Sequence, residues 1–479
     1  MRISAFGGVR RSYPNILVHR LSVPKWKACV RGRFSCMITR MTRHLLLALG
    51  RRFSLRRSLQ NTLQDRRIWQ ASALLLVANS IVTVLGLIRT PVITWLIPKD
   101  EVGMLGVVGS WIPFLQLCSL SGLDSAAYNY IAKGQPWAFI VTTIYRLRWS
   151  LISSMGFLLG AIYWAWREQS GIAWIFVVTG IGFPLAIGMT ASAGMLGAQE
   201  RFRGLFWYRI FESLTDFAGF IPLAFSVWWI SRVLTFYASN QIATGIMQLS
   251  VTLWLIRQVR RSDVKQMQVQ QEREMIRYGK HLTTINGISV LQARSDALLV
   301  GLFMPLGTVA DYSIAMLVYE QIRRLWGIFI AIRYPKLVRM PTKHQRRHIV
   351  LEGGMVWGGL ITIGIVIAFL AQWLIPITLP KSYVSSLGYM NILIGTVLVG
   401  VPGGLAETYF RAQQDESNQY KMRLIAAAVG VIAPSLLIIR WAAYGAAYGR
   451  LLANLTLSIL GIWLFVREPI TKRSTPGME

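Results

Sequence analysis

Apolar segments of about 20 residues follow one another from Ala71 to Phe465, separated by short polar breaks. About 20 helical residues span the hydrocarbon core of a bilayer. The apolar runs are continuous rather than alternating, which argues against the strands of a membrane barrel. The pattern predicts about twelve transmembrane helices, at residues 71–97, 104–130, 149–166, 172–195, 206–230, 233–256, 281–304, 308–332, 349–375, 386–409, 422–439 and 442–465.

The longest polar break inside this region, residues 257–280, divides the predicted helices into two sets of six. A short echo supports the division, because Ile93–Pro98 resembles Val300–Pro305 and each closes the first helix of its half. Paired halves around a central site are a common transporter design. We therefore predict an all-α polytopic membrane protein with two six-helix bundles around a central cavity. The predicted parts are a basic cytoplasmic tail (1–67), an N-terminal bundle (68–256), a cytoplasmic linker (257–280), a C-terminal bundle (281–467) and a cytoplasmic C-terminal tail (468–479).

Composition and charge placement fit this class. The chain is 54% hydrophobic and 15% charged, whereas soluble proteins carry about 25% charged residues. The net charge of +31 is concentrated outside the apolar runs, with sixteen Lys and Arg before Ala71. With the N-terminal tail assigned to the cytoplasm, 24 bases fall in loops on that side and five in the opposite loops. The positive-inside rule then predicts that both termini are cytoplasmic, and this distribution argues against nucleic acid as a partner.

The basic N-terminal tail has three interpretations. Its Arg-rich, acid-poor composition is typical of a transit peptide, and it also suits a polybasic arm attracted to anionic lipid. Alternatively, translation starts at Met37 or Met41, which leaves much of the tail untranslated. The tail is set aside from the fold in each case.

No pattern typical of an enzyme or a metal site stands out. The phosphate-binding Gly-x-x-x-x-Gly-Lys-Ser/Thr motif is absent from the sequence. His344 and His348 are four residues apart, but they lie in a basic loop without a third ligand. The three cysteines show neither a disulfide framework nor metal-ligand spacing. We therefore expect a transporter without a cofactor or a metal.

Charged residues inside the predicted helices are the candidates for function. A charge at the bilayer centre costs about 2.5 to 3.5 kcal/mol on insertion scales, so such groups usually face water or one another. Arg209, Glu212 and Asp216 share one face of the fifth helix, and Glu320 and Arg323 share a face of the eighth. The remaining candidates are Arg89, Asp124, Arg294 and Asp296.

Structural roles compete with binding at several of these positions. Arg209 lies near a helix end, where it could reach the headgroups. Arg323 could simply neutralise Glu320, and Asp124 could cap or pair locally. Arg89 and Arg294 lie well inside the first helix of their half, and a guanidinium matches phosphate oxygens in a two-pronged way. An anionic ligand is therefore the preferred interpretation.

The sequence also resembles the polysaccharide transporters, the O-antigen and exopolysaccharide flippases of the multidrug/oligosaccharidyl-lipid/polysaccharide superfamily. The similarity covers about Arg66 to Arg467, and the motifs that carry it are Gly86–Pro91, Val102–Leu105, Gly122–Ala127, Gln292–Asp296, Leu298–Gly301, Ala310–Ser313, Tyr334–Pro335, Ile375–Pro376 and Lys381–Tyr383. The resemblance implies that a polyprenyl-diphosphate-linked oligosaccharide crosses the bacterial inner membrane by alternating access. It also implies that Arg89, in the string Val84–Arg89, meets the diphosphate.

The resemblance and the charges together give the candidate residues. We predict a substrate path with Arg89, Arg209, Arg294, Asp296 and Arg323, and ion coupling through Asp124, Glu212, Asp216 and Glu320. Expected partners are the lipid-linked oligosaccharide and membrane lipids, with the polymerase and export machinery as further candidates. A cation-coupled multidrug exporter and a non-transporting scaffold for glycan assembly are the alternatives. An exporter of cationic drugs would favour an acidic cavity, against which the arginines argue.

Overall fold

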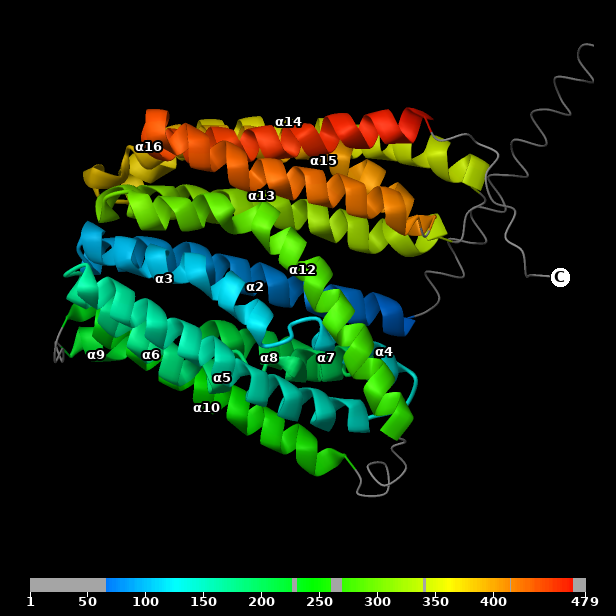
Figure 1. Ribbon diagram of the computed structural model, residues 1–479, viewed down its shortest axis with the longest axis horizontal. Helices are drawn as coiled ribbons and strands as arrows, with labels where there is room; N and C mark the ends of the chain where they lie inside the picture. The colour runs from blue at the N-terminus through cyan, green and yellow to red at the C-terminus, as the bar shows by residue number, and fades with distance from the viewer. Residues whose placement is uncertain (1–65, 226–230, 260–268, 339–341, 414, 468–479) are drawn as a thin grey trace, which may run out of the picture. The chain divides into compact units, whose positions relative to one another are not determined.

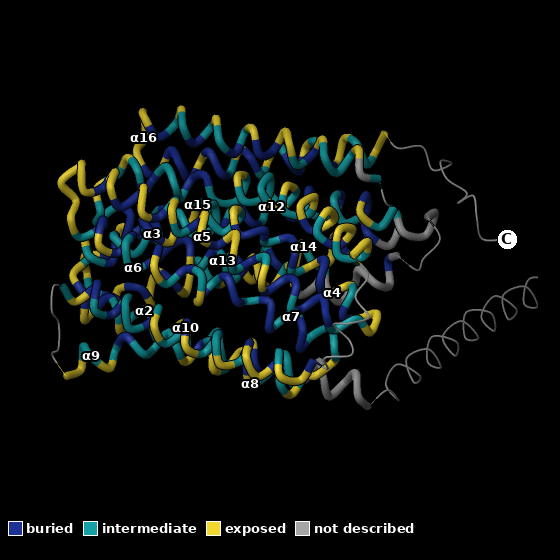
Figure 2. Tube along the Cα trace, turned by 60° about the horizontal axis from the view of Figure 1, so that its bottom comes forward, coloured by how far each residue is buried: buried dark blue, intermediate teal, exposed yellow. Residues whose placement is uncertain are grey.

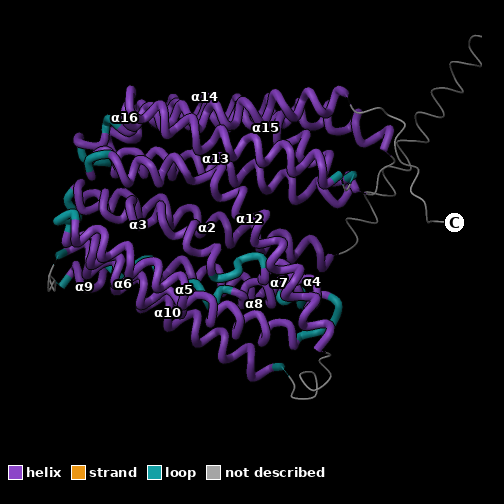
Figure 3. Tube along the Cα trace, viewed as in Figure 1, coloured by secondary structure: helices purple, strands orange, loops and turns teal. Residues whose placement is uncertain are grey.

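The structure, a computed structural model, describes residues 66–225, 231–259, 269–338, 342–413 and 415–467. Within these ranges every regular element is a helix and none is a strand (Figure 3). The elements are α2 (Arg66–Leu96), α3 (Lys99–Cys118), α4 (Leu123–Ala132), α5 (Trp137–Trp166), α6 (Ser170–Ala186), α7 (Ala191–Ala198), α8 (Phe202–Thr215), α9 (Phe220–Ala224), α10 (Arg232–Gln258), α12 (Val269–Phe303), α13 (Leu306–Val338), α14 (Thr342–Thr378), the 3₁₀ turn η1 (Lys381–Tyr383), α15 (Ser386–Ala412) and α16 (Glu416–Arg467).

These elements confirm the prediction of about twelve spans. Three spans are each built from two consecutive helices, α3 with α4, α6 with α7, and α8 with α9. The last element, α16, holds two spans, because Trp441 and Ala442 leave helical backbone angles in its middle. Six described helices are apolar and long enough, by length and composition, to cross a membrane. The predicted tails and most of the break between α10 and α12 lie outside the described residues.

The predicted start of the third span is wrong, and the error affects the interpretation of a buried arginine. The third span was expected to begin at Trp149, but α5 begins at Trp137. The stretch from Trp137 to Tyr145 is apolar enough to extend the helix, so the bases that follow it do not end the span. Arg146 and Arg148 are therefore helical residues rather than members of a loop.

The helices form two bundles within the compact unit from Ala71 to Glu479. Figure 1 shows α13 to α16 gathered in one group and α3 to α10 in another, with α12 running obliquely between them. Consecutive spans are antiparallel, so their turns fall alternately at two ends. We call the end that holds the α2–α3 turn and η1 the Pro98 end, and the end that holds the α10–α12 connection the linker end.

Large apolar side chains cover much of the outer surface. Figure 2 shows buried positions along the interior of the helices and exposed ones along their outer faces. Ile162, Phe369 and Leu436 are typical of the exposed apolar residues. A soluble monomer rarely exposes large contiguous apolar patches, whereas a bilayer solvates them, so this surface agrees with a multi-pass membrane protein.

Small residues bring the two bundles together near the Pro98 end. A Cβ atom on Gly103 of α3 would lie 2.0 Å from the backbone oxygen of Leu306, at the start of α13. One turn further along α3, a Cβ on Gly106 would lie 2.4 Å from the hydroxyl of Ser313. Helices approach this closely in membranes where glycine removes the side chain. The backbones of α3 and α13 are therefore in direct contact.

This contact gives a stability prediction. Gly103→Ala should push α3 away from α13 and lower the free energy of unfolding by about 1–3 kcal/mol, the usual cost of overpacking. Gly109→Ala on the same helix is the matched control, because nothing lies within 4 Å of its added Cβ. Thermal unfolding of both variants in the same detergent measures the difference. Equal melting temperatures would contradict the backbone contact.

Glycines also fold α16 back on itself. A Cβ on Gly445 would meet the backbone oxygen of Leu437 at 2.1 Å, and one on Gly449 would meet Pro434 at 2.4 Å. The two halves of α16 thus pack closely on either side of the break at Trp441 and Ala442. This hairpin carries Arg450 into the core of the C-terminal bundle, where that arginine is only 1% exposed.

Candidate functional site

The arginines within the spans divide into two classes by exposure. Arg146 and Arg450 are fully buried. Arg89, Arg294 and Arg323 are accessible, with side chains 30%, 34% and 46% exposed. Buried guanidinium groups with several partners are structural elements, whereas accessible ones remain able to contact a ligand. The two classes are therefore treated separately.

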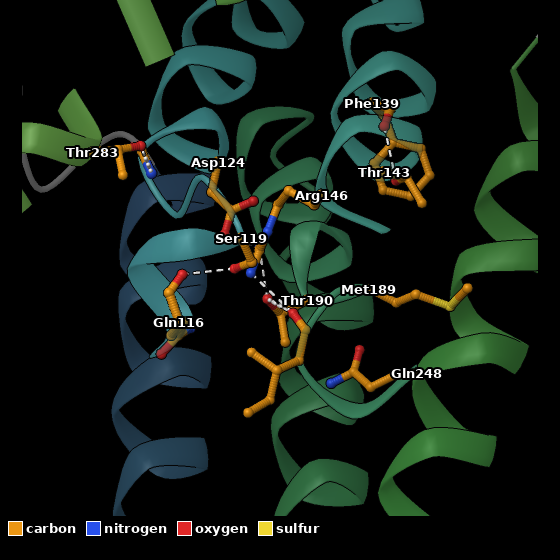
Figure 4. Close-up of polar contacts among 12 residues, drawn as sticks. Gln116, Ser119, Asp124, Phe139, Thr143, Arg146, Met189, Thr190, Gln248 and Thr283 are labelled. Carbon is orange, nitrogen blue, oxygen red and sulfur yellow. Dashed lines mark hydrogen bonds and ion pairs between the residues drawn. The ribbon is translucent and has the colours of Figure 1, made fainter. Parts of the chain in front are cut away.

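Arg146 holds the N-terminal bundle together. Its guanidinium pairs with Asp124 of α4, and it donates hydrogen bonds to the Thr190 hydroxyl at 2.8 Å and to the Ile187 carbonyl at 2.9 Å. Figure 4 shows Arg146 pointing between Asp124 and Thr190. Three elements meet at this one side chain: α4, α5 and the connection between α6 and α7. Asp124 is thus engaged as a structural counter-ion.

Arg450 has the same role in the C-terminal bundle. It pairs with Asp296 of α12 at 2.7 Å, donates to the backbone oxygen of Ala293, and its guanidinium carbon lies 4.3 Å from the centre of the Tyr319 ring. The Tyr312 hydroxyl donates a second hydrogen bond to the same carboxylate oxygen. Asp296 is 1% exposed, so burial closes its carboxylate to a ligand in this conformation.

Arg89 is the accessible arginine of α2. Its guanidinium pairs with Asp216, at the end of α8, at 3.2 Å, and lies 5.7 Å from the centre of the Phe236 ring of α10. Arg89 lies roughly 10 Å from the end of α2 at Leu96, given a rise of about 1.5 Å per residue. The Asp216 side chain is 49% exposed. A half-exposed ion pair exchanges partners at little cost, so the guanidinium remains available.

Arg294 and Arg323 form the accessible group of the C-terminal bundle. Both approach the same carboxylate oxygen of Glu320, at 2.9 Å and 3.7 Å. Two guanidinium groups share one carboxylate, so the group carries an excess positive charge. The sequence placed Arg294 beside Asp296, but residues two apart point to different sides of a helix. The structure therefore separates them, with Arg294 exposed and Asp296 in the core.

Arg209 pairs with Glu212 at 3.3 Å on the surface of α8. Both side chains are more than a third exposed, and this pairing is the local one that the spacing predicts. Asp216, expected on the same face, instead pairs with Arg89 across to α2. Arg209 thus stays separate from the Arg89 pair.

The sequence reasoning missed the structural role of both buried arginines. Arg146 was counted in a loop because the start of α5 was placed too late. The partner of Arg450, Asp296, is 154 residues away in the sequence, a separation over which periodicity gives no information. The apolar run from Trp137 was the available signal for Arg146.

The chemistry available at these positions is binding. Within the described part of the chain, no group of three His, Cys, Asp or Glu side chains is placed to hold a metal ion. Accessible guanidinium groups inside predicted membrane spans suit an anion, and their paired donors match phosphate or carboxylate oxygens. Arg89 and the Arg294–Arg323 group are therefore the candidate anion contacts of the two bundles.

Comparison with known proteins agrees with this picture. Residues 68–341 match the family described as polysaccharide biosynthesis protein. No curated protein matches the sequence.

Solved structures share the fold at low sequence identity. A structure titled lipid II flippase MurJ in an inward closed conformation is 11% identical, with a TM-score of 0.62 over 82% of this chain and 87% of its own. An inward-facing multidrug resistance MATE family transporter of the MOP superfamily is 13% identical, with a TM-score of 0.58 over 83% and 97%. A MOP superfamily transporter from Pyrococcus furiosus is 12% identical, with a TM-score of 0.53 over 84% and 94%.

Proposed function

Because the chain belongs to the polysaccharide biosynthesis protein family, we propose that it is a flippase for a polyprenyl-diphosphate-linked oligosaccharide. The substrate crosses the bacterial inner membrane for the synthesis of a surface polysaccharide such as O-antigen or exopolysaccharide. In this proposal the linker end and both termini face the cytoplasm, which the distribution of Lys and Arg supports. The Pro98 end then faces the extracytoplasmic side.

The observation that carries the proposal is the accessibility of Arg89, Arg294 and Arg323 within the predicted membrane spans. A charge there costs energy on insertion. These three arginines are less buried than Arg146 and Arg450, each of which makes several structural contacts within its bundle. A diphosphate offers anionic oxygens that guanidinium groups bind in pairs. The polyprenyl tail stays in the bilayer, which the apolar outer surface already contacts.

The proposed cycle places the diphosphate between the bundles, in contact with the accessible arginines. Arg89 contributes from the N-terminal bundle, and Arg294 with Arg323 contributes from the C-terminal bundle. Incoming phosphate oxygens compete with Asp216 and Glu320 for these guanidinium groups. The exchange of one anionic partner for another keeps the guanidinium groups paired while the ligand binds and leaves. Arg209 and Asp296 of the predicted path contribute less, since one stays with Glu212 and the other is closed in the core.

The multidrug alternative predicts a different ligand charge. Exporters of cationic drugs need acidic groups free to bind them, whereas every accessible carboxylate of the predicted sites has an arginine partner: Asp124, Glu212, Asp216 and Glu320. A cationic drug would have to displace those arginines. The arrangement favours an anionic headgroup.

A deletion strain tests the proposal directly. Loss of the gene should cause the lipid-linked oligosaccharide to accumulate on the cytoplasmic side, measured by extraction and mass spectrometry after sided hydrolysis in spheroplasts. The intact chain should restore the distribution. An unchanged lipid-linked pool together with a new sensitivity to cationic dyes would reject the flippase and support the exporter.

A further inference from the structure

Most carboxylates inside the spans are paired with an arginine of their own bundle. Asp124, Glu212 and Asp216 pair within the N-terminal bundle, and Asp296 and Glu320 pair within the C-terminal bundle. Rigid-body movement of one bundle against the other leaves such pairs intact. Movement of the bundles alone therefore does not separate these charges, although the sequence suggested Asp124, Glu212, Asp216 and Glu320 for ion coupling.

Asp311 is different, because its cation comes from the other bundle. The carboxylate of Asp311, near the start of α13, accepts from the ammonium group of Lys99, at the start of α3, at 2.8 Å. Lys99 also donates to the backbone oxygen of Ser382, and Ser385 donates its hydroxyl proton to the same Asp311 oxygen. Among the described ion pairs of the spans, this one alone joins α3 to the C-terminal bundle.

The contact lies in a closed environment at the Pro98 end. Asp311 is 4% exposed, and its second carboxylate oxygen has no hydrogen-bond partner among the described residues. Nearby, the indole of Trp95 donates to the backbone oxygen of Thr378 at 2.8 Å, which ties α2 to α14. The glycine-mediated contact of α3 with α13 lies beside it. The Pro98 end is therefore shut in this conformation.

The charged and titratable groups that face Asp311 are few. Lys99 and Asp100 approach from α3, Tyr383 from η1 and Tyr389 from α15. Burial raises the pKa of Tyr383, and the carboxylates of Asp311 and Asp100 raise it further, so this phenol stays neutral. The Tyr383 ring also lies 5.2 Å from the Lys99 ammonium. Lys99 is thus the sole cation described beside Asp311.

If the bundles separate at this end, Lys99 moves away with α3 while Asp311 stays on α13. Asp311 then stays packed against Ser385, Tyr383 and Tyr389 of its own bundle. A carboxylate that remains enclosed in this way after its cation has left is costly and usually becomes neutral instead. We propose that Asp311 is a proton-binding site of this transporter, and that it takes up one proton from water as the Pro98 end opens. When the end closes, the ammonium group of Lys99 returns and the proton leaves the carboxylate.

The neighbourhood suits a proton better than a metal ion. A metal cation in a protein needs several oxygen ligands. Asp311 and the Ser385 hydroxyl are the side-chain oxygens joined in this contact, and the described residues hold no cluster of acidic or His ligands. A proton requires only the free carboxylate oxygen.

Spin-label distances across the Pro98 end test the proposal without any substrate. Labels at Gln169 and Arg440, both exposed and on different bundles, report opening in the full-length chain in nanodiscs, after its three cysteines are replaced by serine. Opening that binds one proton should raise the open-to-closed ratio by up to about tenfold for each unit that the pH falls. The titration is run in potassium salt, and a sodium series at fixed pH follows.

Three variants test whether the pH dependence comes from Asp311 itself or from any change of charge at this end of the protein. Asp311→Asn and Lys99→Gln should each flatten the pH dependence, because the first cannot bind the proton and the second leaves Asp311 without its cation in both states. Glu101→Gln is the matched control, since Glu101 accepts from the Val233 backbone within the N-terminal bundle. It should keep the wild-type response. A wild-type slope in Asp311→Asn, a response to sodium alone, or a distance that never changes with pH would each overturn the proposal.

The inference rests on the proposed function only in assuming that the bundles separate at the Pro98 end. The two can therefore fail independently. If opening depends on pH but deletion of the gene leaves the lipid-linked pool unchanged, the flippase proposal is rejected and the Asp311 proposal stands. If deletion changes the pool but opening does not depend on pH, the Asp311 proposal is rejected and the flippase proposal stands.

Discussion

Arg450→Ala should destabilise the protein by about 3–5 kcal/mol, the usual consequence of removing one partner from a buried ion pair. The substitution leaves the Asp296 carboxylate enclosed with only the Tyr312 hydroxyl to compensate it. It also empties the space beneath the Tyr319 ring. Thermal unfolding of purified protein should show a large fall in melting temperature, together with lower yield from the membrane.

A double variant distinguishes the stranded charge from lost packing. Arg450→Met combined with Asp296→Asn keeps most of the side-chain volume and leaves an amide oxygen for Tyr312, so it should recover most of the stability. Buried pairs replaced together by uncharged residues are often neutral or stabilising. If the double variant is as unstable as Arg450→Ala, the ion pair is not the source of the loss.

Arg89→Ala should reduce flipping by about ten- to a hundredfold while leaving the fold intact. A hydrogen bond to a charged group contributes about 1.5–3 kcal/mol, which corresponds to that range in rate. Its partner Asp216 is half exposed, so water can solvate the carboxylate that remains. The rate of substrate translocation in proteoliposomes, compared at equal protein content, measures the effect.

Two further variants are controls for the Arg89→Ala measurement. Arg89→Lys keeps the charge but loses the two-pronged geometry, and should fall between wild type and alanine. Arg440→Ala removes an exposed base from the Pro98 end and should leave the rate unchanged. A rate in Arg89→Ala equal to that of Arg440→Ala would exclude Arg89 from the substrate path.

The fold could be predicted from sequence because a bilayer imposes a simple rule. Each span must be apolar over about 20 residues and keep its backbone hydrogen bonds within one helix. All twelve spans could therefore be predicted from the sequence, including the two joined in α16. The error at α5 arose because Arg146 and Arg148 were read as the end of a loop, whereas the Asp124 carboxylate lets Arg146 lie inside.

The partners of the charges were less predictable. Spacing found Arg209 with Glu212 and Glu320 with Arg323, which are three residues apart on one helix. Spacing could not predict the pairing of Arg89 with Asp216 or of Lys99 with Asp311, because the two members of each pair lie on different helices. Burial, which separates the structural arginines from the accessible ones, is a property of packing that periodicity does not reveal.

The backbone contact at Gly103 has a consequence for the speed of transport. A passage closed by side chains can open by rotamer changes within nanoseconds, but one closed by two touching main chains cannot. Here whole helices must swing apart, a collective displacement that takes microseconds to milliseconds. Trimming Leu306 or its neighbours should therefore not create a leak, since the obstruction is the carbonyl of the chain itself. The rate at which the two bundles separate would then set the turnover number, largely independently of the size of the oligosaccharide.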